Sequence, residues 1–424
     1  MTLRHFVNGR YRRIRMHTVR SSAYLLGMIF LLVAVLNCVV PKTASSARTL
    51  PLTIPVQVAS NLVYIQGRVN DSREMSVVLD TGASLSIVAP TVAKEIGLHA
   101  SGSAEAAGLG HGSSGSLQIV EDANLKWGNG GSDLQLSGQR IAILSVGYVA
   151  EQVGRPTDAF FGSNVFKNFR VTVDYEAERA TFDLSASLSG VAGESVPIKI
   201  LGDTPFVTAS LLCPDGSRIS GLFLLDSGTT GSLILNKAFL TAHPEITAGR
   251  ALVDFPSVQA VGGAIDLKLV RVAGLEVGSF RFKEPIAAVP QSSTGVLSHP
   301  EIAGFIGAEI MRRFTVTWDY ANQRMSLLPN SHLHDPFESD ASGLRLTVIP
   351  PDYKTIHVAA VLPCSSAAEA GLRAGDIVKT LNGNGDMSLW QLNNELRRPG
   401  TSVVISIQRG TNILSMTLQL RRLV

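Results

Sequence analysis

Cysteine is scarce in this chain, and the three cysteines lie far apart. Cys38 belongs to an apolar run near the start, whereas Cys213 and Cys364 fall in separate predicted domains. A disulfide framework needs an even set of regularly spaced cysteines, and a zinc site needs Cys or His neighbours at ligand spacing. The sequence meets neither condition, so it predicts no disulfide scaffold and no metal site.

Several catalytic motifs are also absent from the sequence. Its nine histidines include no HExxH pair, which excludes the common zinc metalloproteases. No GxSxG elbow is present to carry a serine nucleophile, and no glycine-rich loop ends in Lys-Ser or Lys-Thr to hold a phosphate. The sequence therefore predicts no cofactor, and any chemistry must come from other side chains.

Aromatic residues are few, at 6% of the chain, whereas glycine occurs 39 times. This balance favours short strands joined by tight turns over long helices. An apolar content of 45% with 17% charged residues is typical of a folded protein. At 424 residues the chain has room for two or three domains.

Positive charge is concentrated at the N-terminal end. Residues 1–20 carry six arginines and no acidic residue, and removing these six charges from the net charge of +3 leaves −3 for the rest. The arginines are Arg4, Arg10, Arg12, Arg13, Arg15 and Arg20. A nucleic-acid-binding protein needs a basic face on its folded part. The sequence therefore predicts no nucleic-acid partner.

An uncharged apolar run, residues 21–40, follows this basic segment directly. A helix of about 20 apolar residues spans a bilayer, and arginines before it keep that end in the cytoplasm. The run also fits a cleaved signal peptide, with the small residues Ser45, Ser46 and Ala47 at the cleavage site. Either interpretation places the chain from about residue 48 onward outside the cytoplasm, anchored to the membrane or secreted.

Short apolar runs separated by turn residues fill the middle of the chain. Residues 52–182 and 196–328 share this texture, and runs such as VYIQGRV and FVTASLL predict strands. Helix patterns are few and fall at residues 90–97 and 236–243. Residues 331–341 are polar and predict a linker to a third unit at the C-terminus.

The middle region is an internal repeat of two similar halves. Phe160-Phe161-Gly162 in the first half corresponds to Phe305-Ile306-Gly307 in the second. Five further residues align at the same spacing of 145: Phe169, Val171, Asp174, Tyr175 and Arg179 with Phe314, Val316, Asp319, Tyr320 and Arg324. Upstream, VLDTG at 78–82 corresponds to LLDSG at 224–228, at a spacing of 146. The nearly constant spacing predicts two related β-lobes.

Each half carries one Asp-hydroxyl-Gly tripeptide at the equivalent point of the repeat, beginning at Asp80 and Asp226. A single tripeptide of this kind is usually a turn, because Asp and Ser bond to nearby backbone and Gly permits a positive φ. Two copies at equivalent points, each between apolar strands, instead predict two carboxylates that face each other. Such a pair shares one proton, so one member can activate water while the other polarises a carbonyl.

These motifs resemble those of the pepsin and retropepsin clan of aspartic proteases, over residues 52–330. Residues 79–84 (LDTGAS) are similar to the retropepsin form, and residues 226–229 (DSGT) are similar to the pepsin form. The resemblance implies that Asp80 and Asp226 are catalytic. It also implies supporting roles for the loop residues around them: Thr81, Gly82, Ser227, Gly228 and Thr229.

The hydroxyl residue after the glycine is present in only one of the two half-sites. In the family this hydroxyl bonds the outer oxygen of the carboxylate; Thr229 can supply it, whereas Ala83 cannot. We therefore expect two electrostatically unequal half-sites. We also expect the acidic limb of the activity profile to lie at higher pH than in a site with both hydroxyls.

The resemblance also implies glycine-rich flaps that cover a bound substrate. The candidates are Gly110, His111 and Gly112 in the first lobe, within residues 108–115, and Gly262 and Gly263 in the second. For His111 the loop context favours a solvated surface histidine over a contact with substrate. The flap tyrosine of pepsin-like enzymes has no counterpart between residues 98 and 120, which favours a retropepsin-like flap.

The C-terminal unit, residues 342–424, resembles the PDZ domains attached to bacterial proteases. The resemblance is carried by residues 365–372 (SSAAEAGL), residues 375–378 (GDIV) and the late Pro399-Gly400 turn. It implies that C-terminal peptides bind by adding a strand, with residues 343–346 gripping the terminal carboxylate. These residues are Gly343, Leu344, Arg345 and Leu346. A domain that only packs on the protease is the alternative.

Together these features predict a mainly β fold with two aspartic-protease-like lobes, at 50–192 and 193–330, a linker at 331–341 and a PDZ-like α+β domain at 342–424. The predicted function is an aspartic endopeptidase acting on polypeptides outside the cytoplasm, with PDZ-assisted recruitment and a membrane contact through residues 21–40. The alternative is a non-catalytic peptide-binding or scaffold protein of the cell envelope. Two carboxylates forced together have no evident use in a pure binder, which favours the enzyme.

Overall fold

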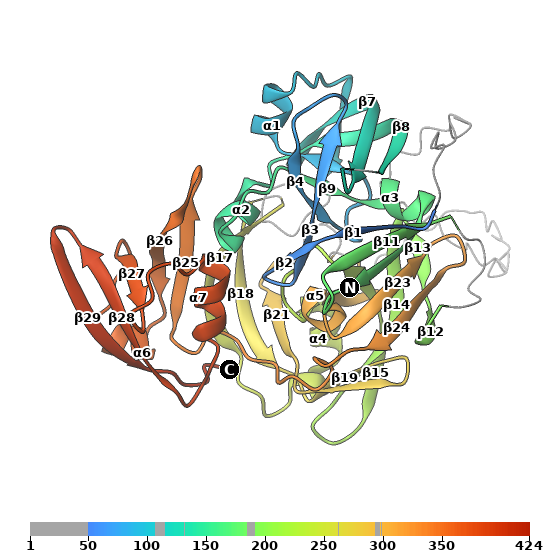
Figure 1. Ribbon diagram of the computed structural model, residues 1–424. Helices are drawn as coiled ribbons and strands as arrows, with labels where there is room; N and C mark the ends of the chain where they lie inside the picture. The colour runs from blue at the N-terminus through green and yellow to red at the C-terminus, as the bar shows by residue number, and fades with distance from the viewer. Residues whose placement is uncertain are drawn as a thin grey trace, which may run out of the picture. The chain divides into compact units, whose positions relative to one another are not determined.

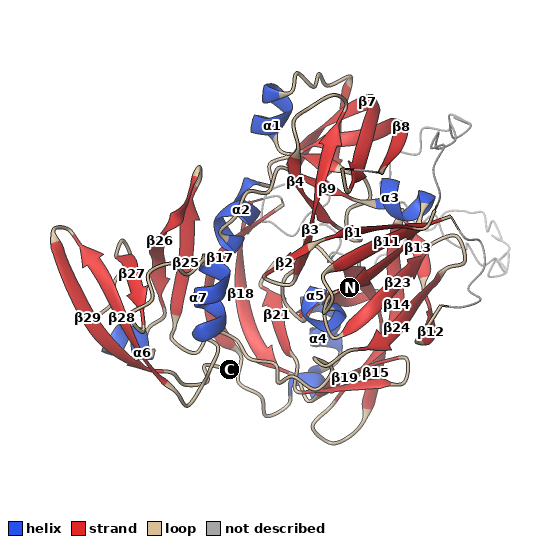
Figure 2. Ribbon diagram, viewed as in Figure 1, coloured by secondary structure: helices blue, strands red, loops and turns tan. Residues whose placement is uncertain are grey.

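The computed structural model describes residues 50–106, 115–130, 132–184, 191–261, 263–292, 297 and 299–424 (Figure 1). The predicted basic segment 1–20 and apolar segment 21–40 lie outside these residues. Within the described residues, no helix has the length and apolar character to cross a membrane. Strands dominate this part of the chain, as Figure 2 shows, and the predicted mainly β class is confirmed.

The first lobe is built on one eight-stranded sheet. Its strand order is β2-β3-β4-β9-β5-β8-β7-β6, and β3 also pairs with β7, so the sheet curls back on itself. The strands are β2 Gln57–Ala59, β3 Leu62–Val69, β4 Met75–Leu79, β5 Ile87–Val88, β6 Gly102–Ala106, β7 Gly115–Gly128, β8 Asp133–Ile143 and β9 Ala159–Phe161. Three short helices accompany them: α1 Pro90–Glu95, α2 Gly147–Val153 and α3 Ser163–Asn168.

The second lobe is built on a ten-stranded sheet. Its strand order is β17-β18-β21-β16-β22-β15-β14-β19-β20, with β13 paired to β14. The strands are β13 Lys199–Leu201, β14 Thr204–Leu212, β15 Arg218–Asp226, β16 Leu233–Leu235, β17 Val253–Ala260, β18 Gly263–Arg271, β19 Gly274–Val277, β20 Phe280–Lys283, β21 Ile286–Pro290 and β22 Ile302–Gly307. The helices are α4 Lys237–Ala242, the 3₁₀ turn Pro244–Thr247 and α5 Ala308–Met311.

A third sheet takes strands from both halves of the repeat. Its order is β1-β11-β10-β23-β24-β12. The strands are β1 Leu52–Pro55, β10 Arg170–Asp174, β11 Arg179–Asp183, β12 Glu194–Pro197, β23 Phe314–Asp319 and β24 Arg324–Pro329. At its centre β10 pairs antiparallel with β23, and Thr172 lies opposite Thr317, with 2.9 Å between their hydroxyl oxygens. These two threonines differ by 145, the repeat spacing, so an approximate two-fold axis passes between them.

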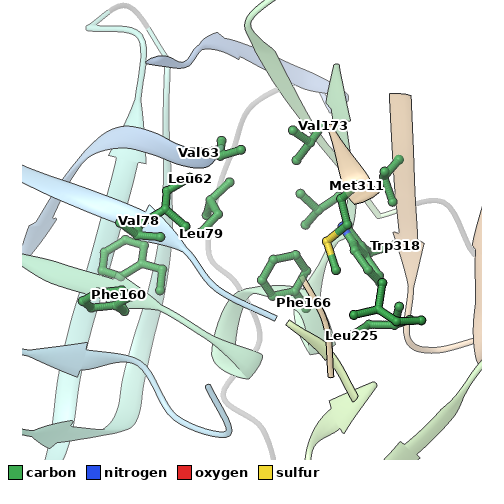
Figure 3. Close-up of a cluster of buried hydrophobic side chains, with 14 of the residues drawn as sticks. Leu62, Val63, Val78, Leu79, Phe160, Phe166, Val173, Leu225, Met311 and Trp318 are labelled. Carbon is green, nitrogen blue, oxygen red and sulfur yellow. The ribbon is translucent and has the colours of Figure 1, made fainter. Parts of the chain in front are cut away.

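The two repeat motifs meet through equivalent parallel strand pairs. In the first half β4 pairs with β9, which places Leu79 beside Phe161, and in the second half β15 pairs with β22, which places Leu225 beside Ile306. Leu79 and Leu225 are both buried, among the apolar side chains that Figure 3 draws at this point. Each Asp-hydroxyl-Gly loop therefore begins from a strand that is fixed in the core.

The glycines that end the two repeat motifs are required by close backbone contact. A Cβ at Gly162 would lie 2.4 Å from the carbonyl oxygen of Ala83, and a Cβ at Gly307 would lie 2.2 Å from that of Gly231. Real Cβ atoms do not come this close to backbone atoms. The apolar-apolar-Gly signature is thus a consequence of seating β9 and β22 against the two loops.

The C-terminal residues form an antiparallel sheet with its own hydrophobic core. The strand order is β25-β26-β27-β28-β29, so β25 is an edge strand. The strands are β25 Leu344–Ile349, β26 Asp352–Val361, β27 Ile377–Leu381, β28 Ser402–Arg409 and β29 Asn412–Gln419, with helices α6 Ser366–Glu369 and α7 Leu389–Glu395. The Ser388 side chain caps α7 and Gln391 returns a bond, which explains where this helix begins.

Helix formation was only partly predictable. The two predicted helices at 90–97 and 236–243 are present as α1 and α4. The patterns did not predict α2, α3, α5, α6 and α7. Helices of four to seven residues have too few turns to show a 3.6-residue period reliably, and the two that were predicted, α1 and α4, are equally short. The predicted polar linker contains no strand or helix, but Phe337 within it is buried against the second lobe.

Candidate active site

The two Asp-hydroxyl-Gly loops are joined by four crossed hydrogen bonds. The Thr81 hydroxyl donates to the carbonyl of Leu225 at 2.8 Å and accepts from the backbone N–H of Ser227 at 3.0 Å. The Ser227 hydroxyl donates to the carbonyl of Leu79 at 2.9 Å and accepts from the N–H of Thr81 at 2.9 Å. Both hydroxyl residues are buried. Each loop is therefore held by the other, and the geometry of the two carboxylates is fixed.

The glycines of these loops allow the two carboxyl groups to meet. A Cβ at Gly82 would lie 2.7 Å from Cγ of Asp226, and a Cβ at Gly228 would lie 2.6 Å from Cγ of Asp80. No larger residue fits at either position without displacing the opposite carboxylate. The structure thus brings together all seven residues that the sequence assigns to the dyad and its support. They are Asp80, Thr81, Gly82, Asp226, Ser227, Gly228 and Thr229.

The two carboxylates receive unequal hydrogen bonding. The N–H of Gly82 donates to Oδ1 of Asp80 at 2.8 Å, and the N–H of Gly228 donates to Oδ1 of Asp226 at 2.9 Å. Among the described residues, only Asp226 has a hydroxyl donor at its second oxygen, the Thr229 hydroxyl at 2.8 Å from Oδ2. The equivalent position in the first loop is Ala83, which has no donor on its side chain.

Both carboxyl groups hold their proton more tightly than usual. Burial raises the pKa of Asp80, and the charge of Asp226 raises it further. Burial also raises the pKa of Asp226, but the Thr229 hydroxyl and the Gly228 N–H oppose that rise by stabilising its ionised form. A hydrogen bond joins the two carboxyl groups. In the singly protonated pair the proton is therefore held mainly at Asp80, and the charge mainly at Asp226.

Two supporting residues were missed from sequence, although both follow the apolar-apolar-Gly motifs. Asn164 accepts the N–H of Ser86 at 2.7 Å, and the Ser86 hydroxyl in turn accepts the N–H of Gly162 at 3.1 Å. Glu309 is the equivalent of Asn164 at the repeat spacing of 145, and its N–H donates to the carbonyl of Gly231 at 3.3 Å. Both residues brace the segment that follows the aspartate. Their position two residues after each motif glycine was the available signal.

The predicted flaps correspond to two hairpins. The first is β6–β7; Gly110, His111 and Gly112 lie between its strands and outside the described residues. The second is β17–β18, in which Ala260 pairs with Gly263. Gly263 has a φ of +112°, a conformation that favours glycine. Gly262 lies outside the described residues, and a flap role for all five stays a prediction.

Tyr148, on α2, lies close to the dyad and was not singled out from the sequence. Its ring is half-buried, and the backbone of Val261 in the β17–β18 hairpin forms a hydrogen bond with its hydroxyl. Burial raises the pKa of Tyr148, and the charges of Asp80 and Asp226 raise it further. The charges of both aspartates therefore reach a tyrosine, and this tyrosine lies on a helix and not in the first hairpin.

The four residues assigned to peptide capture lie at the start of β25. Gly343 has a φ of +82°, and a Cβ there would lie 2.1 Å from Cβ of Ser365, so glycine is required. Leu344 and Leu346 are buried in the C-terminal core. The Arg345 guanidinium donates to the carbonyl of Ser257 in β17. Arg345 therefore contacts the second lobe in this structure. The backbone N–H groups of this segment are then the groups that would donate hydrogen bonds to a peptide's terminal carboxylate, as predicted.

Known proteins match parts of the chain. Residues 65–164 match the model of a family described as aspartyl protease. An aspartic proteinase from Irpex lacteus is similar at 16% identity and a TM-score of 0.42, covering 67% of this chain and 98% of that one. The HtrA3 PDZ domain bound to a phage-derived ligand is similar at 23% identity and a TM-score of 0.17, covering 18% of this chain and 80% of that one. A search of curated proteins gives no match.

A photosystem II D1 C-terminal processing protease is similar at 23% identity and a TM-score of 0.19. The match covers 20% of this chain and only 23% of that protease. The family match supports an aspartyl protease for the first half of the repeat, which contains Asp80, and it ends before Asp226. The PDZ identity of the C-terminal unit stays a prediction.

Proposed function

We propose that this protein is an aspartic endopeptidase that hydrolyses peptide bonds of polypeptides outside the cytoplasm. The observation that carries the proposal is the pair of carboxyl groups at Asp80 and Asp226, hydrogen-bonded to each other and locked by four crossed bonds between their loops. Rigid, paired carboxyls that retain one proton are suited to activating water without a covalent intermediate.

The unequal hydrogen bonding assigns a role to each carboxyl. Asp226, ionised and held by Thr229, accepts a proton from a water molecule as its oxygen attacks the peptide carbonyl carbon. Asp80, protonated, donates to the carbonyl oxygen and so stabilises the tetrahedral diol. The proton gained by Asp226 then passes to the amide nitrogen, the C–N bond breaks, and Asp80 recovers its proton from the collapsing diol. The dyad ends in its starting state.

The ends of the chain support two further parts of the proposal. The arginine-flanked apolar segment at 21–40 fits an anchor or signal that places the protease outside the cytoplasm. The edge strand β25 is suited to pairing with an extended peptide, so the C-terminal domain would recruit a substrate or a partner. A purely peptide-binding protein remains the competing hypothesis, and the coupled carboxyls favour catalysis over it.

Asp80→Asn and Asp226→Asn test the proposal directly. Each removes one carboxyl while nearly preserving its shape, so each should lower the rate of cleavage of a denatured protein by about 10³-fold or more. Thermal unfolding and circular dichroism of the same variants should match the wild type. If a correctly folded variant cleaves at a near-normal rate, or if the wild type binds peptides and never cleaves them, the enzyme assignment is wrong.

A further inference from the structure

The short helix α2 uses two faces to contact two different parts of the molecule. Tyr148 and Gln152 are four residues apart and therefore share one side of the helix. The backbone carbonyl of Glu151 and the capping residue Gly154 lie at the C-terminal end of the helix.

One face of α2 holds the β17–β18 hairpin of the second lobe. The side-chain amide of Gln152 donates to the carbonyl of Gln259 in β17 at 3.2 Å. The Tyr148 hydroxyl is hydrogen-bonded to the backbone of Val261, which follows β17. The charges of both aspartates act on the same tyrosine. This side of the helix therefore holds the hairpin and carries a tyrosine within electrostatic range of the dyad.

The other face of α2 packs against the C-terminal domain. The helix lies on β25, and the Thr347 hydroxyl lies 3.2 Å from the carbonyl of Glu151 and 3.2 Å from that of its neighbour Val348, so the two carbonyls share its proton. Gly154 is in close contact with α7, because a Cβ there would lie 2.4 Å from Cβ of Leu389. Arg345 of β25 also reaches β17 directly, at the carbonyl of Ser257. The C-terminal domain therefore contacts both the helix and the hairpin that the helix holds.

We propose that the C-terminal domain controls substrate binding at the dyad through α2. By fixing α2, it fixes the helix that carries Tyr148 and holds the β17–β18 hairpin in position. Thr347 and Leu389 act as positioning residues, since they reach the substrate site only through this helix. An extended polypeptide that pairs with the edge of β25 would bind the strand that also contacts α2. Binding of this polypeptide to β25 should therefore change the affinity for substrate at the dyad, and binding of substrate should change the affinity for the polypeptide by the same factor. The inference rests on the proposed protease function.

Gly154→Ala in the full chain tests the link, with Gly97→Ala as a matched control. Both glycines end a first-lobe helix in a left-handed conformation, with φ of +80° at Gly154 and +67° at Gly97. An added methyl meets Leu389 at Gly154 but meets nothing within 4 Å at Gly97. Both variants therefore have the same strain from placing alanine at a positive φ, and only Gly154→Ala also pushes α2 away from α7.

The readout is amide hydrogen exchange of β17 and β18, which requires no proteolytic activity. The added methyl overpacks the contact with Leu389 and displaces α2, which weakens its hold on the β17–β18 hairpin. We therefore expect amide exchange in β17 and β18 to rise roughly tenfold in Gly154→Ala. In Gly97→Ala it should match the wild type. Equal exchange in the two variants would overturn the link, whether or not the protein proves to be a protease.

Thr347→Val supplies a milder variant that preserves volume and folding. It removes the bond to Glu151, and Thr417→Val, at an exposed threonine on the distant strand β29, is its control. We expect KM for a peptide substrate to rise about threefold in Thr347→Val, the effect of one lost neutral hydrogen bond, with kcat within about twofold. An unchanged KM, or a loss confined to kcat, would show that β25 does not act on substrate binding through α2.

Discussion

Ala83→Ser is the most informative single substitution at the dyad, because it makes the two half-sites alike. Ala83 occupies the position that Thr229 holds in the second loop, where the hydroxyl lies 2.8 Å from Oδ2 of Asp226. Asp80 receives backbone N–H donors from Gly82 and Ala83 but no hydroxyl at this position. A serine at 83 would supply the missing donor with the addition of one oxygen atom.

The size of the effect follows from the energy of a hydrogen bond to a charged group, about 1.5–3 kcal/mol. Such a bond to ionised Asp80 corresponds to a pKa lower by about 1–2 units. Activity needs the singly protonated pair, whose proton is held mainly at Asp80, and it is lost on the alkaline side when that proton leaves. The serine should therefore move the alkaline limb of the profile to lower pH by about one unit.

The acidic limb should move much less. On that side the first proton leaves mainly from Asp226, which already has its hydroxyl partner. With serine at 83, the charge can lie on either aspartate with equal energy, so two singly ionised forms are populated in place of one. This factor of two lowers the first pKa of the pair by only about 0.3 units. The sequence alone predicts an effect of Ala83 on the acidic limb; with the hydrogen-bond asymmetry of the pair taken into account, we expect the larger effect on the alkaline limb.

The assay is the pH dependence of kcat/KM for a peptide substrate, since this ratio reports the ionisation of the free enzyme. Thr229→Val is the complementary variant, because it removes the donor to Asp226 and should move the acidic limb to higher pH. A shift of a full unit in the acidic limb of Ala83→Ser, or an unmoved alkaline limb in a folded variant, would refute the assignment of the proton to Asp80.

Two further predictions follow from the loops and from the N-terminal segment. Gly82→Ala places a methyl 2.7 Å from Cγ of Asp226 and should lower kcat/KM by about 100-fold, whereas Gly231→Ala, whose methyl meets nothing within 4 Å, should keep near-normal activity. Equal losses would show that the close approach is not needed. Because residues 21–40 are predicted to direct the chain across the membrane, protease added to spheroplasts should remove a C-terminal tag. A tag protected until the membrane is lysed would contradict this topology.

Much of the architecture was predictable because the repeat carries long-range information. A constant spacing of 145 told which residues were equivalent, and the pairing of Thr172 with Thr317 is a direct consequence of that equivalence. The tripeptides at Asp80 and Asp226 gained meaning only from their equivalent positions. A single copy would have been indistinguishable from a turn.

The remaining parts depend on contacts that leave no periodic pattern. Tyr148 lies on a helix of seven residues, and only tertiary packing brings it within electrostatic range of the dyad. From its sequence neighbours Arg345 looks like an exposed loop arginine. The position of β25 nevertheless brings its guanidinium to the carbonyl of Ser257. Asn164 and Glu309 share a repeat position but differ in chemistry, so their common bracing role is invisible in a comparison of side chains.

A single chain permits the two half-sites to diverge, which a symmetric dimer of identical lobes cannot do. Ala83 and Thr229 are such a divergence, and in the proposed mechanism they assign the acid to Asp80 and the base to Asp226. Exchanging them in the double variant Ala83→Ser with Thr229→Ala should reverse the roles. Because the pair titrates as a unit, the reversed dyad should have nearly the wild-type pH profile, within about 0.5 units on each limb, although each single substitution moves one limb. If the double variant instead shows the sum of the two single shifts, the roles are fixed by the surroundings of each lobe and not by the hydroxyl donor.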